Sequence, residues 1–360
     1  MAKKIVNITD VCSEIFAGGD APKNKMSTQK TSEYTIPIYS NGEDADGLYG
    51  YTNFARVTLP SITVSARGTI GYTSIRNEPF VPIVRLITIT PIPKLISIRY
   101  LYYAVKNLSF TGSGTSIPQL TVPMVKQYNF PLPPLGEQRK IAAVLDKVSD
   151  LIAKRRQQLD KLDKLVKSRF IELFGDPILN QYGWSKVPLE ENATLLNGRA
   201  YKQDELLDSG KYPVLRVGNF FSNRGWYYSD LELDEDKYCE NGDLLYAWSA
   251  SFGPQIWNGD KVIYHYHIWK VLVGSAYNKQ FLCKLLEYAT ESLMGDTHGI
   301  AMMHLTKSGM EKTEFIVPPI DLQEQFAAFV EQTDKSKLAV QQGLQELEIL
   351  KKSLMQEYFE

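Results

Sequence analysis

The chain contains two copies of one unit, and this internal repeat constrains its fold more than any local pattern does. Residues 119–175 align without a gap on residues 304–360 at an offset of 185, and 16 of these 57 positions are identical. Two unrelated segments of ordinary composition would share about three or four. A looser match places residues 62–71 opposite residues 244–253 at an offset of 182. Each unit therefore consists of a variable N-terminal portion and a well-kept C-terminal segment.

The variable portions contain short runs rich in β-branched and aromatic residues, which Gly, Asn and Pro interrupt. This pattern predicts a compact mixed α/β domain in each unit, and an α+β fold for the chain as a whole. The runs are ITVSA at 62–66, PIVRLITIT at 82–90, LLYAW at 244–248 and VIYHYHIWKVLV at 262–273.

The well-kept segments begin with a Pro-Pro pair, at 133–134 and at 318–319, which suits the approach to a helix but not its interior. Apolar residues then recur every seven positions, so the sequence predicts a helix of roughly 28 residues, about 40 Å long, in each unit. Two separate amphipathic helices would satisfy this pattern, but such lengths favour an antiparallel coiled coil with an approximate two-fold axis. The seam residues are Ile152, Leu159, Leu162, Val166 and Leu173, then Val340, Leu344, Leu347 and Leu354.

Composition narrows the class of protein. A length of 360 residues, with 44% hydrophobic and 22% charged residues, predicts more than one domain. Cys12, Cys239 and Cys283 are odd in number and far apart, which favours reduced thiols over disulfides and offers no zinc spacing. No apolar stretch approaches the roughly 20 residues that span a bilayer, so we expect a soluble, cytoplasmic protein with no membrane partner. We also expect no bound metal.

The net charge of −1 argues weakly against a nucleic-acid partner, because DNA-binding domains are usually basic. The charge is, however, unevenly distributed. Residues 1–130 carry +5 and residues 131–177 carry +3, whereas residues 178–315 carry −5 and residues 316–360 carry −4. The acidic half is either a docking surface for protein partners or a solvated surface that keeps the chain soluble.

Two further motifs occur at the junctions between the variable and well-kept portions. They are Gly-Thr-Ser-Ile-Pro-Gln-Leu-Thr at 114–121 with PPLGEQ at 133–138, and Gly-Ile-Ala-Met-Met-His-Leu-Thr at 299–306 with PPIDLQEQ at 318–325. In this order, twice, and followed by long helices, the motifs resemble the specificity subunit of type I restriction-modification systems.

The resemblance covers essentially the whole chain and implies two similar mixed α/β target recognition domains joined by two long helices in an antiparallel coiled coil. It implies recognition domains at 1–130 and 178–315, a central region at 131–177 with the first spacer helix, and a distal region at 316–360 with the second. Positions that the resemblance places in partner-binding helices are Leu159, Leu162, Val166, Leu344, Leu347 and Leu354.

The same resemblance implies a function. Each recognition domain would read one half of an asymmetric, interrupted target in double-stranded DNA, and the helices would set the unread spacer. Two methyltransferase subunits would bind the helical region and supply S-adenosylmethionine chemistry on adenine. Restriction subunits, which use ATP and Mg²⁺ for translocation and cleavage, would join them, and this chain would bind none of these cofactors itself.

Candidate DNA contacts lie in polar loops and glycine-containing turns, where backbone can approach a ligand closely. The loop at 16–23 resembles that at 195–202, and the turn at 65–69 aligns with the one that follows Trp248. Neutral surface loops would look the same, so both interpretations stay open. The candidates are Lys23, Lys25, Lys30, Ser65, Arg67, Thr69, Arg199, Lys202, Arg216, Asn219, Trp248, Ser249 and His298, which touches a phosphate or only caps a turn.

Other chemistry-bearing patterns are weak. His265 and His267 would share one face of a strand, which permits a metal, but without a third ligand nearby a packed strand is favoured. The Gly112–Thr115 segment lacks the lysine of a nucleotide-binding loop. A methyltransferase would need a glycine-rich cofactor turn and an aromatic-acidic motif, and the acidic run at 230–240 lacks the carboxylate-lysine arrangement of an Mg²⁺-dependent nuclease.

The sequence therefore predicts a non-catalytic DNA-recognition subunit. Two alternatives remain open: a coiled-coil scaffold or adaptor that never reads DNA, and a single-chain DNA methyltransferase or endonuclease with degenerate motifs. Strong salt dependence of duplex binding would argue against the first, and methylation by the isolated chain would support the second.

Overall fold

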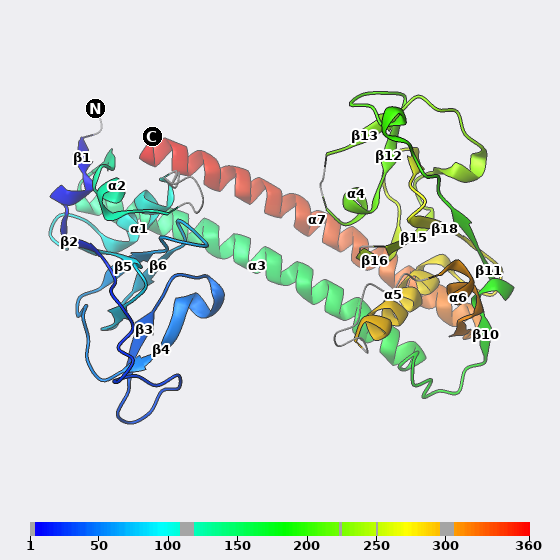
Figure 1. Cartoon of the computed structure of the whole chain (residues 1–360), viewed down its shortest axis with the longest axis horizontal. Coiled ribbons are helices and arrows are strands. Elements are labelled where there is room, and N and C mark those ends of the chain that lie inside the picture. The colour runs from blue at the N-terminus through cyan, green and yellow to red at the C-terminus, as the bar shows by residue number, and fades with distance from the viewer. Residues whose placement is uncertain (1–3, 109–118, 223–224, 250, 296–305) are drawn as a thin grey trace. The chain divides into compact units, whose positions relative to one another are not determined.

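The computed structural model describes residues 4–108, 119–222, 225–249, 251–295 and 306–360, with side chains described outside 292–295. The fold is α+β, as predicted, and the elements follow one another twice in the same order (Figure 1). The chain divides into two compact units, Met1–Arg156 with Gln342–Glu360, and 157–341. Among the described residues, no helix has both the length and the apolar composition that crossing a bilayer requires.

Within its described residues, the first unit holds three sheets and two short α-helices. Its first strand pairs antiparallel with its last, β1 with β9, and thereby closes the domain. The four-stranded sheet has the order β2-β8-β5-β6 and the three-stranded sheet the order β4-β3-β7, in which β3 and β7 are parallel. The bounds are β1 (Ile5–Asn7), β2 (Cys12–Ala17), β3 (Ile36–Tyr39), β4 (Leu48–Thr52), β5 (Ser61–Val64), β6 (Thr73–Arg76), β7 (Val81–Pro82), β8 (Ile87–Pro91), β9 (Asn129–Pro131), α1 (Ile98–Lys106) and α2 (Val122–Lys126).

The second unit repeats this topology with one extra strand. β10 pairs with β19, the first large sheet has the order β11-β18-β15-β16, and the second has the order β13-β12-β17-β14 with β12 and β17 parallel. The bounds are β10 (Lys186–Pro188), β11 (Ala193–Asn197), β12 (Tyr212–Leu215), α4 (Val217–Phe221), β13 (Tyr227–Ser229), β14 (Tyr238–Cys239), β15 (Leu244–Ser249), β16 (Ser251–Ile256), β17 (Val262–Tyr264), β18 (Ile268–Val273), α5 (Lys279–Gly295), α6 (Lys307–Lys312) and β19 (Glu314–Ile316).

Strand registers confirm the alignment of the variable portions. Val64 of β5 pairs with Ile87 of β8, and Tyr246 of β15 pairs with Trp269 of β18. Both members of the pair are therefore shifted by 182 residues, which is the offset found in the sequence. One position in the first domain can thus be matched with one position in the second by counting along these strands.

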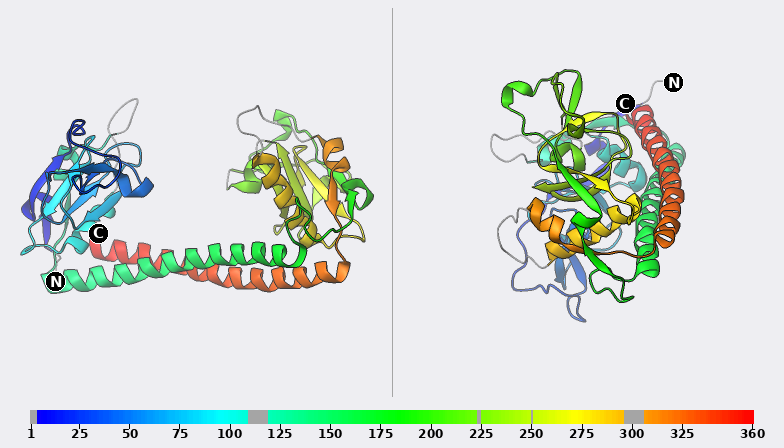
Figure 2. Two further views of the ribbon diagram at one scale, coloured as in Figure 1. Left: turned by 90° about the horizontal axis from the view of Figure 1, so that it is seen from below. Right: turned by 90° about the vertical axis from the view of Figure 1, so that its right-hand side faces the viewer.

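Two long helices follow the Pro-Pro pairs, α3 (Leu135–Phe174) and α7 (Ile320–Phe359), each of 40 residues. They are longer than the predicted 28 residues because each begins directly after its prolines, and at 1.5 Å per residue each measures about 60 Å. Within each unit the α3 segment packs antiparallel on the α7 segment (Figure 2), and in the second unit Asp163 contacts Lys337 whereas Phe170 contacts Phe326. The antiparallel coiled coil is confirmed.

Apolar residues of the helices complete the core of each unit. In the first, Phe359 packs against Tyr100 of α1 with ring centroids 5.0 Å apart. In the second, Phe174 lies 4.6 Å from Phe281 of α5 and 5.8 Å from Phe326. Sheet, short helix and long helix are therefore parts of one hydrophobic core in each unit, and the second core is richer in aromatic rings.

A repeated glutamine fastens each long helix to the domain before it. Gln138, 1% exposed, accepts a hydrogen bond from the backbone N–H of Ser97 (2.8 Å) and donates to the carbonyls of Leu95 (3.1 Å) and Pro133 (2.8 Å). Gln323, fully buried, makes the same three kinds of bond. Its partners are Asn278 (2.8 Å), Ala276 (3.0 Å) and Pro318 (2.8 Å). The identity of this residue in the two repeats thus has a structural cause.

Candidate nucleic-acid interface

The first recognition domain has a concave surface of about 1160 Å³, which we call the first groove. Three residues singled out in the sequence, Lys23, Lys25 and Arg67, line it together. The structure adds Arg85 and the half-exposed ring of Phe54. Four cationic side chains therefore surround one cavity, although no single stretch of sequence carries more than two of them.

The floor of the first groove requires unusual backbone. A Cβ at Gly18 would lie 2.5 Å from the carbonyl carbon of Pro82, so only glycine fits there. Val84 and Arg85 have φ angles of 51° and 63°, a left-handed conformation that is costly for a β-branched residue. Their N–H groups donate to the carbonyls of Gly19 (2.7 Å) and Gly18 (3.0 Å). This strained turn presents Arg85 to the groove.

The turn that carries Arg67 contains three predicted DNA contacts, of which two are exposed and one is buried. Arg67 is exposed and donates to Gln119 at 2.8 Å, and Thr69 is exposed but outside the groove lining. Ser65 is 1% exposed and its hydroxyl accepts the N–H of Gly42 at 3.2 Å. Because it faces the interior, Ser65 supports the turn. Lys30 is exposed and also lies outside the lining.

The second recognition domain has a smaller cavity of about 340 Å³, the second groove. Of the residues predicted there, Arg216 lines it, and its guanidinium lies 4.9 Å from the Tyr227 ring centroid. Asn219 accepts the backbone N–H of Arg216 at 3.4 Å and so supports the first turn of α4. His267 and Phe221 complete a lining that is less cationic and more aromatic than that of the first groove.

Two predicted contacts in the second domain serve its packing. Trp248 donates from Nε1 to the carbonyl of Tyr266 at 2.8 Å and stacks on Trp269 with centroids 5.7 Å apart. Ser249 is 8% exposed. The ring of Trp248 also meets that of His267 at 5.0 Å, so it borders the groove rather than projecting from it.

The loop at 195–202 is shifted by one residue relative to the sequence match with 16–23. The N–H of Gly18 donates to Leu86, and that of Gly198 donates to the matching residue Ile268. Gly18 is therefore equivalent to Gly198, and Lys23 has no equivalent in Lys202. Sequence alone paired these loops wrongly because a short loop has too few landmarks to fix a register.

Arg199 is held by an ion pair within its own loop. Its guanidinium donates to both carboxylate oxygens of Glu205 at 2.8 Å, and the N–H of Lys202 donates to the same carboxylate at 2.8 Å. The bond from Arg199 and that from Lys202 lower the pKa of Glu205 to about 2. Arg199 must therefore exchange this carboxylate for a phosphate if it is to contact DNA.

The expected strand at 262–273 is wrong in its middle, because a turn at Tyr266 and His267 separates β17 from β18, while His265 forms an isolated bridge with Arg199. Nδ1 of His265 accepts the N–H of His267 at 3.4 Å. Burial, aided by His267 and Arg216, lowers the pKa of His265 to about 4, so this imidazole is neutral at physiological pH. Among described residues, no three His, Cys, Asp or Glu side chains gather as metal ligands would. His298 lies outside the described residues.

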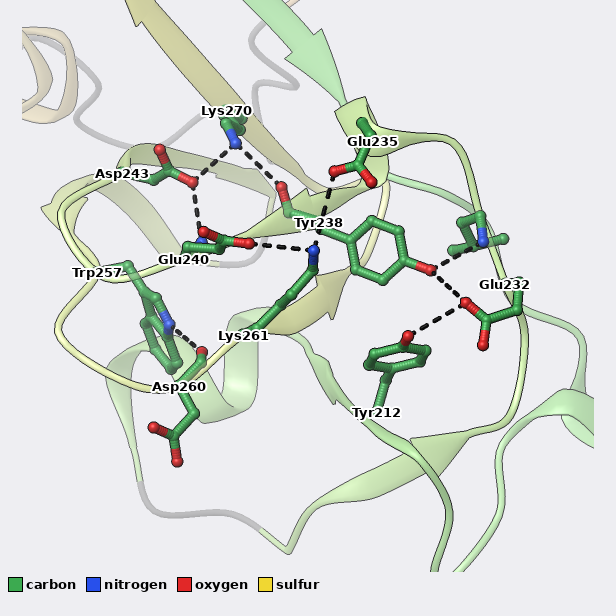
Figure 3. A network of polar contacts seen from close by, with 11 residues as sticks. Tyr212, Glu232, Glu235, Tyr238, Glu240, Asp243, Trp257, Asp260, Lys261 and Lys270 are labelled. Atoms are coloured by element: carbon green, nitrogen blue, oxygen red, sulfur yellow. Dashed lines mark hydrogen bonds and ion pairs between the residues drawn. The ribbon is translucent and has the colours of Figure 1, made fainter.

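The acidic run after residue 230 is tied to the second domain by its own lysines and tyrosines (Figure 3). Lys261 contacts Glu240 at 3.1 Å and Glu235 at 3.8 Å, and Lys270 contacts Asp243 at 2.8 Å. Much of the negative charge in this segment is therefore paired within the domain.

The predicted helical positions lie along the seam between the long helices. Val166 is 3% exposed and part of the second core, whereas Leu159, Leu162, Leu344, Leu347 and Leu354 are half-buried. Other apolar side chains of these helices face solvent, and sequence periodicity missed them because they lie outside the heptad seam. They are Val144, Leu151, Leu165, Ile171, Ile320, Leu338, Ile349 and Leu350.

Comparison with known proteins identifies the family. The family model described as type I restriction modification DNA specificity domain matches residues 2–163 and again residues 181–349. The chain belongs to this family. Each match covers one recognition domain and most of the helix after it, so the resemblance inferred from the repeated motifs is confirmed.

Individual members of the type I specificity family agree. The MjaIX type I restriction enzyme specificity subunit of Methanocaldococcus jannaschii is 23% identical over 91% of this chain and 85% of its own. A putative type I specificity subunit of Mycoplasma pneumoniae, S.MpnORF507P, is 38% identical, but that match spans 40% of this chain and 39% of the relative. The chain thus aligns with about two fifths of that relative.

Solved structures of type I restriction-modification proteins share the fold. The crystal structure of the S subunit from M. genitalium has a TM-score of 0.62 at 16% identity and covers 100% of this chain and 96% of its own. A chain from a structure titled for complex assembly and conformational transition of the type I system has a TM-score of 0.58 at 15% identity, with 99% and 97% covered.

Proposed function

We propose that this specificity subunit reads a bipartite, asymmetric target in double-stranded DNA, one half with each recognition domain. The observation that carries the proposal is that two domains of the same topology place differently lined cavities beside equivalent turns. Two domains of the same topology would each bind one half-site, and their different linings would favour different base sequences. The proposal assigns no catalytic step to this chain, which would act in the cytoplasm.

The first groove has the chemistry that DNA recognition requires. An arginine can donate two hydrogen bonds to the O6 and N7 atoms of guanine, whereas lysines neutralise phosphates without reading sequence. We assign base contacts to Arg67 and Arg85 and phosphate contacts to Lys23 and Lys25. The exposed ring of Phe54 offers an apolar contact for a thymine methyl group.

In the second groove, the guanidinium of Arg216 and the imidazole of His267 are the groups that would contact bases. Arg199 and Lys202 stand on the neighbouring loop, where Glu205 competes with DNA for the arginine. This domain carries more acidic than basic residues, so its share of the affinity would depend more on direct base contacts and less on general attraction to phosphates.

The long helices would set the unread spacer and bind the partner subunits. Two methyltransferase subunits would dock on the exposed apolar side chains of α3 and α7 and bring S-adenosylmethionine. Restriction subunits would bring ATP and Mg²⁺. Addition of one helical turn, about 5.4 Å, to both helices would then lengthen the spacer, because the half-sites follow the positions of the domains.

The test is to co-express the chain with its methyltransferase subunit and to map methylated adenines across the host genome by single-molecule sequencing. We expect one asymmetric motif of two parts with a fixed gap. Replacement of residues 178–315 by another recognition domain should change one half only, and the unchanged half then belongs to the first domain.

Other outcomes would support the alternative functions. A stable complex that yields no methylation motif, with duplex binding absent or insensitive to salt, would favour a scaffold. Methylation by the purified chain with S-adenosylmethionine alone would favour a single-chain enzyme. Either result would overturn the proposal.

A further inference from the structure

In both recognition domains a side chain donates a hydrogen bond to the same backbone carbonyl, but the side chain differs. Counted from the paired strands β5–β8 and β15–β18, Val84 is equivalent to Tyr266. In the first domain, Nδ2 of Asn41 donates to the carbonyl of Val84 at 2.6 Å. In the second domain, Nε1 of Trp248 donates to the carbonyl of Tyr266 at 2.8 Å. This carbonyl is therefore bridged to a second segment in both domains.

Asn41 makes a second bond that separates two backbone segments. Its Oδ1 accepts the N–H of Ala66 at 2.7 Å. The equivalent N–H in the second domain belongs to Trp248 and donates directly to the carbonyl of His267 at 3.0 Å. The amide of Asn41 thus stands between the segments of Ala66 and Val84, where the second domain has a direct backbone hydrogen bond.

These two segments carry the arginines of the first groove. Arg67 follows Ala66, and Arg85 follows Val84 in the left-handed turn. The spacing between the two guanidinium groups therefore depends on a side chain that is not among the groove-lining residues. In the second domain the matching positions are Ser249 and His267, and the two turns are joined by a direct backbone hydrogen bond.

Asn41 is itself fixed in place. The N–H of the following residue, Gly42, donates to the hydroxyl of buried Ser65 at 3.2 Å. The segment then turns back on itself, with the N–H of Ser40 bonded to the carbonyl of Gly47 at 2.8 Å. Arg76, 4% exposed, anchors this turn through the carboxylate and the carbonyl of Asp46. Because Asn41 is held in place, its amide constrains the backbone positions of both turns that it contacts.

We propose that Asn41 is a positioning residue for base recognition by the first domain, because its amide sets the distance between Arg67 and Arg85. The inference rests on the proposed function of the first groove. Only a side chain with both a donor and an acceptor can serve the carbonyl of Val84 and the N–H of Ala66 together. An aspartate keeps the acceptor and loses the donor.

The test uses the complex with the methyltransferase subunit and a pool of duplexes randomised in both half-sites. Asn41→Asp places a carboxylate oxygen against the carbonyl of Val84 and should displace Arg85. We expect the base preference in the half-site of the first domain to fall about tenfold, the order of magnitude of one bidentate contact. The preference in the other half-site should stay as in the wild type.

A double variant separates positioning from general support of the fold. If Asn41 acts through Arg85, then Asn41→Asp should have little further effect on base preference in an Arg85→Ala background. Asn77→Asp is the matched control, because it makes the same charge change at an exposed position of the same domain and should leave both preferences unchanged.

Several results would overturn the inference. They are an unchanged preference in Asn41→Asp, an equal loss in both half-sites, or a full effect in the Arg85→Ala background. If Asn41→Asp yields no complex, Asn41→Ala removes both the donor and the acceptor without adding a charge, and retention of the wild-type preference by that variant would overturn it too. A wild-type chain without any bipartite preference would instead remove the proposed function, so the two failures are distinguishable.

Discussion

The two recognition domains share one topology, apart from an extra strand in the second, but their grooves differ in charge and size. The first groove gathers four cationic side chains around about 1160 Å³, whereas the second gathers one arginine, two histidines and the ring of Phe221 around about 340 Å³. At equivalent positions Arg85 is replaced by His267 and Ala66 by Trp248. The comparison shows that the paired strands determine the position of each turn, whereas the residues on the turn determine the charge and the size of the groove beside it.

The largest expected effect tests whether the two cores are equally dependent on the aromatic residue near the end of the long helix. Phe174 packs on three phenylalanines, and its repeat equivalent Phe359 packs on one tyrosine. Phe174→Ala should cost about 4–5 kcal/mol of unfolding free energy, at the upper end for aromatic truncation, and Phe359→Ala about 3 kcal/mol, at the lower end. Urea denaturation followed by circular dichroism measures both, and equal losses would contradict the difference between the cores.

The next largest effect tests a feature that the two units share, the buried glutamine in the first turns of each long helix. Gln138→Ala and Gln323→Ala each remove three buried hydrogen bonds, so each should destabilise its unit by about 2–3 kcal/mol. Gln138→Glu keeps the acceptor for Ser97 but not the donors, and is the matched variant. Proteolysis across 90–100 and 275–280 would report the loosened junctions. A loss in one unit alone would break the equivalence.

A smaller effect separates the grooves by their base contacts. Arg85→Ala and His267→Ala should each relax one half-site only, with the arginine costing about 1–3 kcal/mol of discrimination and the imidazole less, because it has fewer donors than a guanidinium. Binding selection on duplexes randomised in one half-site at a time gives both values. Relaxation of the same half-site by both variants would contradict the assignment of one domain to each half.

The lysines of the first groove should change affinity without changing the motif. Lys23→Ala and Lys25→Ala each remove one phosphate contact, so each should lower the slope of log binding constant against log salt by about 1. Titrations from low to moderate salt measure the slope, and Lys30→Ala is the control because Lys30 lies outside the lining. A changed motif would show instead that the lysines read bases.

The smallest effect concerns the ion pair between Arg199 and Glu205, which has no counterpart at the equivalent position of the first domain because Gly19 stands there. Because the folded pKa of Glu205, about 2, lies below its ordinary value of 4.5, the Arg199–Glu205 pair stabilises the fold above about pH 4.5. That contribution is lost as the pH falls toward 2. The urea midpoints of the wild type and Arg199→Ala should therefore converge on acidification. A gap that widened below pH 4 would contradict this.

The sequence predicted the parts of the fold that are written in repeated or periodic patterns. The repeat fixed two equivalent units, and the heptad seam predicted two antiparallel helices because buried faces recur at helical spacing. Three of the candidate DNA contacts in the first domain, Lys23, Lys25 and Arg67, line one groove, while their contact with DNA stays a prediction. Their individual exposure was not predictable, because alternate residues of one turn, such as Ser65 and Arg67, face opposite sides.

What only the tertiary structure decided are the relations between turns that are distant in sequence. No local signal marks Asn41 or the left-handed pair at Val84 and Arg85, because their conformation is imposed by strands that converge from separate segments. The pairing of Arg199 with Glu205 is likewise a matter of loop geometry. The sequence by itself determined the family, the duplication and the helical seam, since burial patterns are local. Tertiary packing alone decided which charged groups meet around a cavity, because the four cations of the first groove come from three different connections between strands.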